Sequence, residues 1–154
     1  MGQVVYSLRF EGKISDGGAP DQKRADSIAP GLSVITVIDG AGVGGTVGAL
    51  VNGGQAHFQS QVKFLGPNSF DERGTIDFGN SHTLEFATVI SGYVGDTAEA
   101  GIQHGGVIWN VVGGTGQFQG ATGLIVGNFF IKDGKKVVDH HLGYIFTADP
   151  DRKS

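Results

Sequence analysis

The sequence predicts an all-β protein, either a barrel or a sandwich of antiparallel strands. Glycine accounts for 28 of the 154 residues, well over twice its usual share. Only four prolines accompany the glycines, and short apolar runs separate the glycine clusters. This pattern is typical of strands that are joined by tight turns and interrupted by bulges. No segment shows the apolar spacing of a convincing amphipathic helix.

Eight segments alternate in polarity or are rich in β-branched and aromatic residues, and we expect each to be a strand. They are residues 4–10, 32–39, 57–65, 74–78, 81–90, 106–112, 124–131 and 137–148. The polar segment 15–24 is expected to be a loop, and the glycine-rich segment 40–54 a loop or a weak strand. Asp133-Gly134 is a hairpin turn signal. The strands predict one domain, residues 1–148, followed by a charged and frayed tail, residues 149–154.

Composition argues against several classes of function. The formal net charge of −4 opposes a nucleic-acid partner, which requires a basic face. The chain has no cysteine, so it has no disulfide, no thiolate nucleophile and no zinc–thiolate site. No apolar run approaches the roughly 20 residues of a membrane span, and the first residues do not read as a signal peptide. We therefore expect a soluble, cytoplasmic protein without nucleic-acid or membrane partners.

The most unusual stretch is GGTGQFQGATG, residues 113–123. A P-loop requires a Lys-Ser/Thr pair after its last glycine, and a dinucleotide fingerprint requires GxGxxG before a helix. Here no such pair occurs, the spacing GTGQFQG misses the fingerprint by one residue, and a strand-like segment follows. We expect a connection between two antiparallel strands, in which glycines supply positive φ angles and Phe118 folds inward to plug one end of a barrel.

The longer stretch VVGGTGQFQGATG resembles a segment shared by plant allene oxide cyclases and dirigent proteins. FGNSHTLEF (residues 78–86), Ser91-Gly92-Tyr93 and DGGAP (residues 16–20) extend the resemblance. It implies an eight-stranded antiparallel barrel of the allene oxide cyclase type, assembled as a homotrimer. It also implies an apolar cavity at one mouth, and chemistry that needs no metal or other cofactor. Ile14 stands where the cyclases carry a glutamate, so the resemblance does not extend to their reaction.

Isolated polar residues in such a barrel are candidates for proton transfer, for which His, Glu and Tyr are suited. Glu85 is the only charged residue in the predicted strand 81–90, although the alternation does not show which face points inward. His104 is expected at a barrel rim, beside two glycines that permit close approach of a ligand. By contrast, Asp71, Glu72 and Arg73 are interpreted as a solvated strand start.

The run Asp139-His140-His141 is the densest cluster of titratable groups. Asp139 and His141 would share one face of a strand, and His140 and Tyr144 the other. We favour His140 and Tyr144 as the cavity lining, because aromatic rings with polar tips suit a ligand pocket. An Asp–His pair on the opposite face remains the alternative. A metal site is not favoured, since adjacent histidines on a strand point in opposite directions.

These observations give a list of candidate residues. The candidate catalytic residues are Glu85, His104, His140 and Tyr144, and the candidate substrate-binding residues are Tyr93, Phe86, Phe118 and Asn128. The first functional hypothesis is a cofactor-free isomerase, cyclase or tautomerase that acts on a small apolar or conjugated molecule. The second is a dirigent-like protein that only orients a reactive intermediate. A sugar-binding barrel is less favoured, because a single tryptophan is available for stacking.

Overall fold

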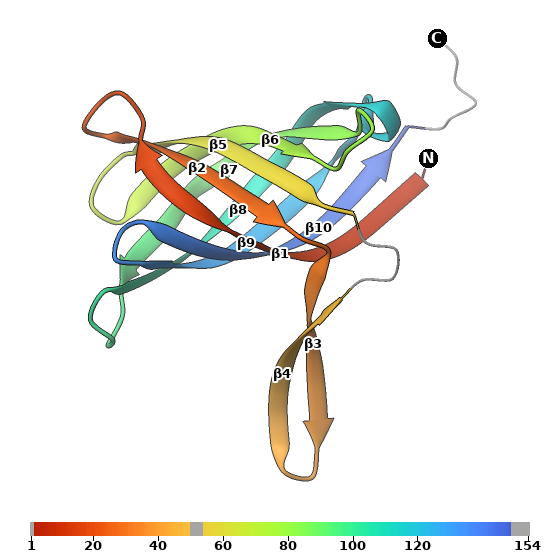
Figure 1. The fold of residues 1–154 in the computed structure, drawn as a ribbon. Coiled ribbons are helices and arrows are strands. Elements are labelled where there is room, and N and C mark those ends of the chain that lie inside the picture. The colour runs from red at the N-terminus through yellow and green to blue at the C-terminus, as the bar shows by residue number, and fades with distance from the viewer. Residues whose placement is uncertain (1, 50–53, 149–154) are drawn as a thin grey trace.

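The computed structural model describes residues 2–49 and 54–148. These residues form ten strands and one short 3-10 helix, η1 (Figure 1). The strands are β1 (Gly2–Asp16), β2 (Gln22–Ala29), β3 (Leu32–Asp39), β4 (Gly42–Ala49), β5 (Ala56–Phe64), β6 (Ser69–Asp77), β7 (Thr83–Asp96), β8 (Ile102–Thr115), β9 (Thr122–Lys132) and β10 (Lys136–Thr147); η1 covers Gly116–Phe118.

Eight of these strands close into an antiparallel barrel. The order around the barrel is β1-β10-β9-β8-β7-β6-β5-β2, and every neighbouring pair is antiparallel. The predicted all-β class and the eight-stranded antiparallel barrel are therefore confirmed. A barrel of this size has an interior that side chains can fill, or that can hold one small ligand.

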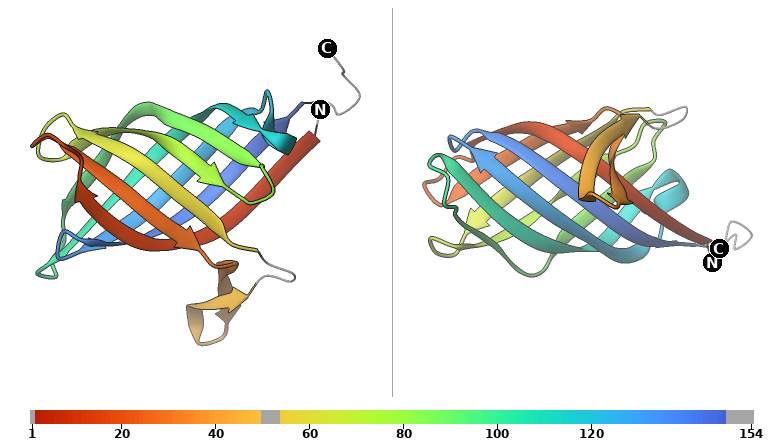
Figure 2. Two further views of the ribbon diagram at one scale, coloured as in Figure 1. Left: turned by 45° about the horizontal axis from the view of Figure 1, so that its top comes forward. Right: turned by 90° about the horizontal axis from the view of Figure 1, so that it is seen from below.

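One predicted barrel strand belongs elsewhere. The segment 32–39 is a strand, but β3 pairs with β4 in a separate hairpin that projects away from the barrel (Figures 1 and 2). The chain turns out of the barrel wall at Pro30 and Gly31. Proline cannot donate a ladder hydrogen bond, and the φ of Gly31 is 71°. At the base of the hairpin, Ser33 Oγ donates a hydrogen bond to Ser7 Oγ at 3.1 Å.

The eighth barrel strand is β2, which begins inside the predicted loop 15–24. Its inward residues include the small side chains of Ala25, Ser27 and Ala29, while Arg24 and Asp26 point outward. Small inward residues give little hydrophobic alternation, so the predicted loop 15–24 was too long: residues 17–21 connect β1 to β2, whereas residues 15–16 and 22–24 belong to those strands. The segment 40–54 contains β4, in part as expected, and residues 50–53 lie outside the described residues. The predicted tail, 149–154, also lies outside them.

The turn predictions hold. Asp133 and Gly134 have φ angles of 53° and 67°, and Lys135 N–H donates to the Lys132 carbonyl at 3.1 Å, so the β9–β10 hairpin uses the expected turn. The glycine stretch 113–123 connects β8 to β9 through η1, and Phe118 is only 4% exposed. Its ring centroid lies 5.4 Å from that of Phe78, which confirms that Phe118 plugs one end of the barrel.

The two ends of the barrel therefore differ. The plugged end carries η1, and both chain ends leave from it, as Figure 1 shows. The opposite end carries the connections β1–β2, β5–β6, β7–β8 and β9–β10. Between the ends, the central layer is aromatic: Phe10, Phe58, Phe86 and Trp109 are each no more than 3% exposed.

Candidate functional site

A cavity of about 230 Å³ opens inside the barrel toward the end opposite Phe118. Its walls are mostly apolar, and seven strands contribute apolar side chains to them, among which are Ile14, Ala25, Val62, Phe64, Phe70, Val94, Phe129 and Val137. Cavities of roughly 150 Å³ are large enough for benzene, so this one can take a molecule with one or two small rings. Two acids, Glu72 and Asp139, also line it.

Glu72 reaches the interior because the inner and outer positions of β6 alternate regularly, with Phe70, Glu72 and Ile76 on the inner face. The pairing of β6 with β5 keeps one register throughout, and Glu72 lies opposite Val62. The register with β7 shifts between Phe70 and Arg73, and there the Glu72 N–H bonds to the Thr88 side chain at 3.4 Å. The Glu72 side chain is only 8% exposed, so the interpretation of Glu72 as part of a solvated strand start was wrong.

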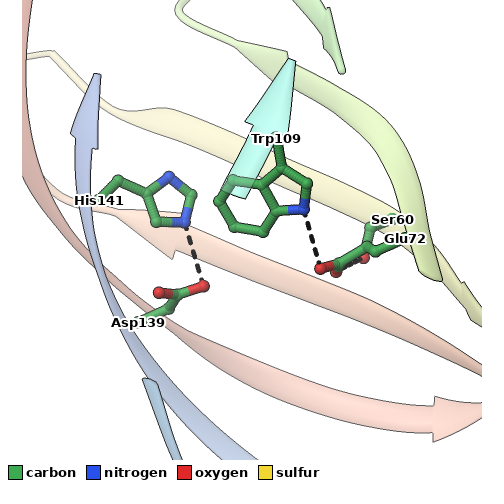
Figure 3. Close-up of polar contacts among 5 residues, drawn as sticks. All are labelled: Ser60, Glu72, Trp109, Asp139 and His141. Carbon is green, nitrogen blue, oxygen red and sulfur yellow. Dashed lines mark hydrogen bonds and ion pairs between the residues drawn. The ribbon is translucent and has the colours of Figure 1, made fainter. Parts of the chain in front are cut away.

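Two donors hold the Glu72 carboxyl group. Ser60 Oγ donates to Oε2 at 2.5 Å, and the indole Nε1–H of Trp109 donates to Oε1 at 3.1 Å (Figure 3). Burial raises the pKa of Glu72 from its ordinary value of 4.5 to about 7, and the nearby Asp139 contributes in the same direction. The hydrogen bonds from Ser60 and Trp109 favour the ionised form and lower the pKa, but burial has the larger effect.

The raised pKa of Glu72 makes the stability of the fold depend on pH. Between pH 4.5 and about 7, the native protein binds a proton at Glu72 that the unfolded chain has released. The free energy of unfolding should therefore fall as the pH rises through this window, by about 3 kcal/mol from Glu72 alone. Urea unfolding at about pH 5 and about pH 8 should show this fall. Glu72→Gln should lose that component, whereas the exposed control Glu85→Gln should keep it. An equal fall in Glu72→Gln and the wild type would contradict the prediction.

Asp139 and His141 form the second polar group inside the barrel. They are 7% and 1% exposed, and His141 Nε2 lies 3.2 Å from Asp139 Oδ2. The His141 ring packs against Phe10 and Trp109, with centroid distances of 4.2 and 4.9 Å. Because a buried and unpaired N–H is costly, the hydrogen bond assigns the proton of the imidazole to Nε2.

The favoured orientation of β10 was therefore wrong. Asp139 and His141 face inward, whereas Tyr144 is 44% exposed and His140 lies on the same outer side. Tyr144 donates a hydrogen bond to Gln3 Oε1 at 2.8 Å on the outside of the barrel. Glycines make room for the inward pair: a Cβ at Gly127 would lie 2.8 Å from the Trp109 ring and 3.0 Å from Asp139 Oδ1.

Tyr6 completes the buried polar set. Its hydroxyl group is buried and makes no hydrogen bond within the described residues. Burial raises the pKa of Tyr6 far above its ordinary value, and the negative charge of Asp139 adds to the effect. Tyr6 is therefore held in its neutral form, as a potential hydrogen-bond donor inside the barrel.

The other candidates divide between the two sides of the wall. Phe86 and Phe118 are buried inside the barrel, although neither lines the cavity beside Glu72. Glu85 lies on the outer face of β7 and is exposed. Tyr93, His104 and Asn128 come together in a shallow hollow on the outer face of β7, β8 and β9, with the rings of Tyr93 and His104 6.4 Å apart. That hollow is separate from the interior cavity.

Sequence reasoning missed Glu72, Ser60 and Tyr6. A signal for Glu72 was present in SFDERGTID, where Phe70, Glu72 and Ile76 share one face of a strand. An acid between two large apolar residues on one face is a candidate for burial. Within residues 2–49 and 54–148, no group of three or more His, Cys, Asp or Glu side chains is placed to hold a metal ion.

These features define the chain as a closed eight-stranded barrel with an acid-lined interior cavity. Comparison with protein-family models, curated protein sequences and solved structures gave no match for the chain. In the part of the chain that the structure describes, none of the helical segments has the length and apolar character needed to cross a membrane.

Proposed function

We propose that the protein is a cofactor-free enzyme that moves a proton on a small apolar or conjugated molecule bound in the barrel. The observation that carries the proposal is Glu72, a carboxyl group that lines an apolar cavity and has a pKa of about 7. A general acid–base works best when its pKa lies near the working pH. Such a group suits the proton transfers by which isomerases, cyclases and tautomerases can work. A cytoplasmic location is part of the proposal and rests on the sequence alone.

The chemistry requires one group that can accept and return a proton. The Glu72 carboxylate would take a proton from a carbon next to a carbonyl or imine group. The C–H electron pair would form a double bond to the carbonyl or imine carbon, while the C=O or C=N π pair moves onto the oxygen or nitrogen. The same carboxyl group would then return the proton at another position of the conjugated system. Ser60 and Trp109 fix the carboxyl group by their hydrogen bonds, and such positioning is a large part of catalysis.

A dirigent-like role is the second candidate, and the aromatic walls favour it. Phe64, Phe70 and Phe129 could orient a reactive ring without any proton transfer. Such a pocket would respond to changes in its shape, but not to the ionisation of Glu72. The two candidates therefore differ in their dependence on pH.

The proposal is tested with 5-nitrobenzisoxazole, a general probe for a buried base. Removal of its ring proton sends the C–H electron pair into a nitrile and breaks the N–O bond, which releases a coloured phenolate. Because the ionised form of Glu72 is the base, we expect the rate to rise with pH and to be half-maximal near pH 7. A rate no faster than that with acetate, or one that does not change through this range, would favour the dirigent-like role.

We further propose that the protein is a homotrimer, which the family resemblance implies. The outer face of β1, β10 and β9 supports the assembly, because it exposes Val5, Leu124, Val126, Leu142 and Tyr144, each by 44–59%. Val5 pairs with Tyr144, Tyr144 with Leu124, and Leu142 with Val126, so these side chains form one apolar surface. Such surfaces usually mark interfaces.

Sedimentation equilibrium should give three times the chain mass of 16.0 kDa. Leu142→Asp should give a monomer, because it places a charge within the apolar surface. The control Gln61→Asp, at an exposed position of β5, should stay trimeric. A wild-type protein that is monomeric at all concentrations would rule out the assembly.

A further inference from the structure

The second acid of the cavity has an unused hydrogen-bonding position. Asp139 lines the cavity and is 7% exposed. Its Oδ2 bonds to His141, but its Oδ1 is buried and receives no hydrogen bond from any of the residues 2–49 and 54–148. The buried Tyr6 hydroxyl does not donate to it. Glu72, by contrast, has a donor on each oxygen. A buried carboxylate oxygen without a donor is costly, so a ligand that brings a donor would be favoured here.

The charge of the cavity specifies the kind of donor. The charged residues in its lining are Glu72, Asp139 and Lys23. Lys23 does not neutralise the acids inside, because its ammonium group bonds to Asp16 at 2.8 Å, and Asp16 is exposed at the end of β1. His141 pairs with Asp139, but one imidazole does not offset the two carboxyl groups of Glu72 and Asp139. The interior is thus acidic and selects a cationic ligand over an anionic one.

The walls suit a cation that carries a ring. Phe70 lies between Phe64 and Phe129, with ring-centroid distances of 6.3 and 6.0 Å, and all three rings line the cavity. Aromatic faces attract cations and also pack against flat rings. The volume of about 230 Å³ restricts the ligand to a small molecule.

We propose that the cavity binds a small ring-containing cation, whose protonated amine or iminium nitrogen donates to the carboxyl group of Asp139 while its ring packs against Phe70 and Phe129. The inference deepens the proposed function and rests on it for one point, that the substrate binds in this cavity. It makes the substrate class a cyclic or aryl-substituted amine or imine. An iminium group also acidifies the neighbouring C–H bond, and this is the bond on which Glu72 would act.

The test compares three probes of similar shape and different charge: benzylammonium, benzyl alcohol and benzoate. Calorimetric titration at about pH 8 keeps the amine protonated. We expect benzylammonium to bind about tenfold more tightly than benzyl alcohol, because a charge-assisted hydrogen bond replaces a neutral one. Benzoate should bind more weakly than both. Asp139→Asn should lower the preference of the amine over the alcohol, because it removes the carboxylate that accepts the charge-assisted hydrogen bond and leaves Glu72 as the one acid in the cavity lining.

Asp71→Asn is the matched control, since it also replaces an aspartate by asparagine, but on the outer face of β6 next to Glu72. There the Asp71 carboxylate accepts a hydrogen bond from the Ser91 hydroxyl. This variant should keep the preference. The preference is a ratio of two affinities measured on the same protein, so a partial loss of folded protein in a variant does not change it. If Asp139→Asn does not fold, the ratio in the wild-type protein decides whether the cavity prefers a cation.

Two results separate this inference from the proposed function. If the amine binds no better than the alcohol, or if neither ring compound binds, the inference is overturned, whereas a Glu72-dependent ring opening of 5-nitrobenzisoxazole would still support the proposed function. If the amine preference is found but ring opening does not depend on Glu72, the cation site stands and the proton-transfer proposal fails.

Discussion

Replacing Glu72 with glutamine is expected to slow the ring opening of 5-nitrobenzisoxazole by about a hundredfold or more. Glutamine has nearly the same shape as glutamate but cannot accept the proton. It can also keep both contacts: its Oε1 can accept from Trp109, and its amide group can donate to the Ser60 hydroxyl, which is free to reverse its role. The loss of rate should therefore appear without a loss of folded protein. Stopped-flow or plate absorbance at the phenolate band measures it.

Glu85→Gln is the matched control, because Glu85 lies on the outer face of the barrel. It should retain the full rate and the midpoint near pH 7. A residual rate in Glu72→Gln that still titrates near neutral pH would show that another group is the base. Asp139 would then be the first residue to examine, because it is the other acid that lines the cavity.

Trp109→Ala is expected to lower the free energy of unfolding by about 3–5 kcal/mol. Trp109 is fully buried, and its ring centroid lies 5.0 Å from that of Phe86 and 5.6 Å from that of Phe58. Removing it opens a large space at the centre of the barrel and also removes a donor from the carboxyl group of Glu72. Urea unfolding monitored by far-ultraviolet circular dichroism gives the change.

Trp109→Phe separates these two effects. It keeps most of the ring but loses the indole N–H, so the loss of stability should be smaller than for alanine. Because the hydrogen bond from Trp109 lowers the pKa of Glu72, its removal should move the midpoint of the pH–rate profile above that of the wild type. A midpoint that stays in place would contradict the role of the indole in setting the pKa.

The barrel could be predicted from the sequence where the chain alternates strongly, as in β5, β7 and β10. It was misassigned where the alternation is weak. In β2, inward alanine and serine residues gave too little contrast with the polar outer positions. The segment 32–39 is rich in Val and Ile and was correctly predicted as a strand, yet it lies in the projecting hairpin and not in the barrel wall, with Ile38 78% exposed. Local preference identifies a strand, but it does not show which sheet the strand joins.

The interior site was harder to predict, because the closure of the barrel decides which face of each strand points inward. In β10, Asp139-His140-His141 offered two faces, and the polarity of the side chains favoured the wrong one. Here two polar residues, Asp139 and His141, occupy the inner face, and the glycine at position 127 gives them space. That contact joins residues from two strands, so the local sequence of β10 does not contain it.

Because Gly2 pairs with Thr147, anything attached to either end of the chain would be joined to the same end of the barrel. Gly2 and Thr147 both lie at the end of the barrel that Phe118 closes, and the interior cavity opens toward the other end. A tag, a surface linker or a fused domain attached at either terminus would thus lie at the end opposite the cavity opening. The rim would remain open to solution when the protein is immobilised on a sensor chip or displayed on a carrier.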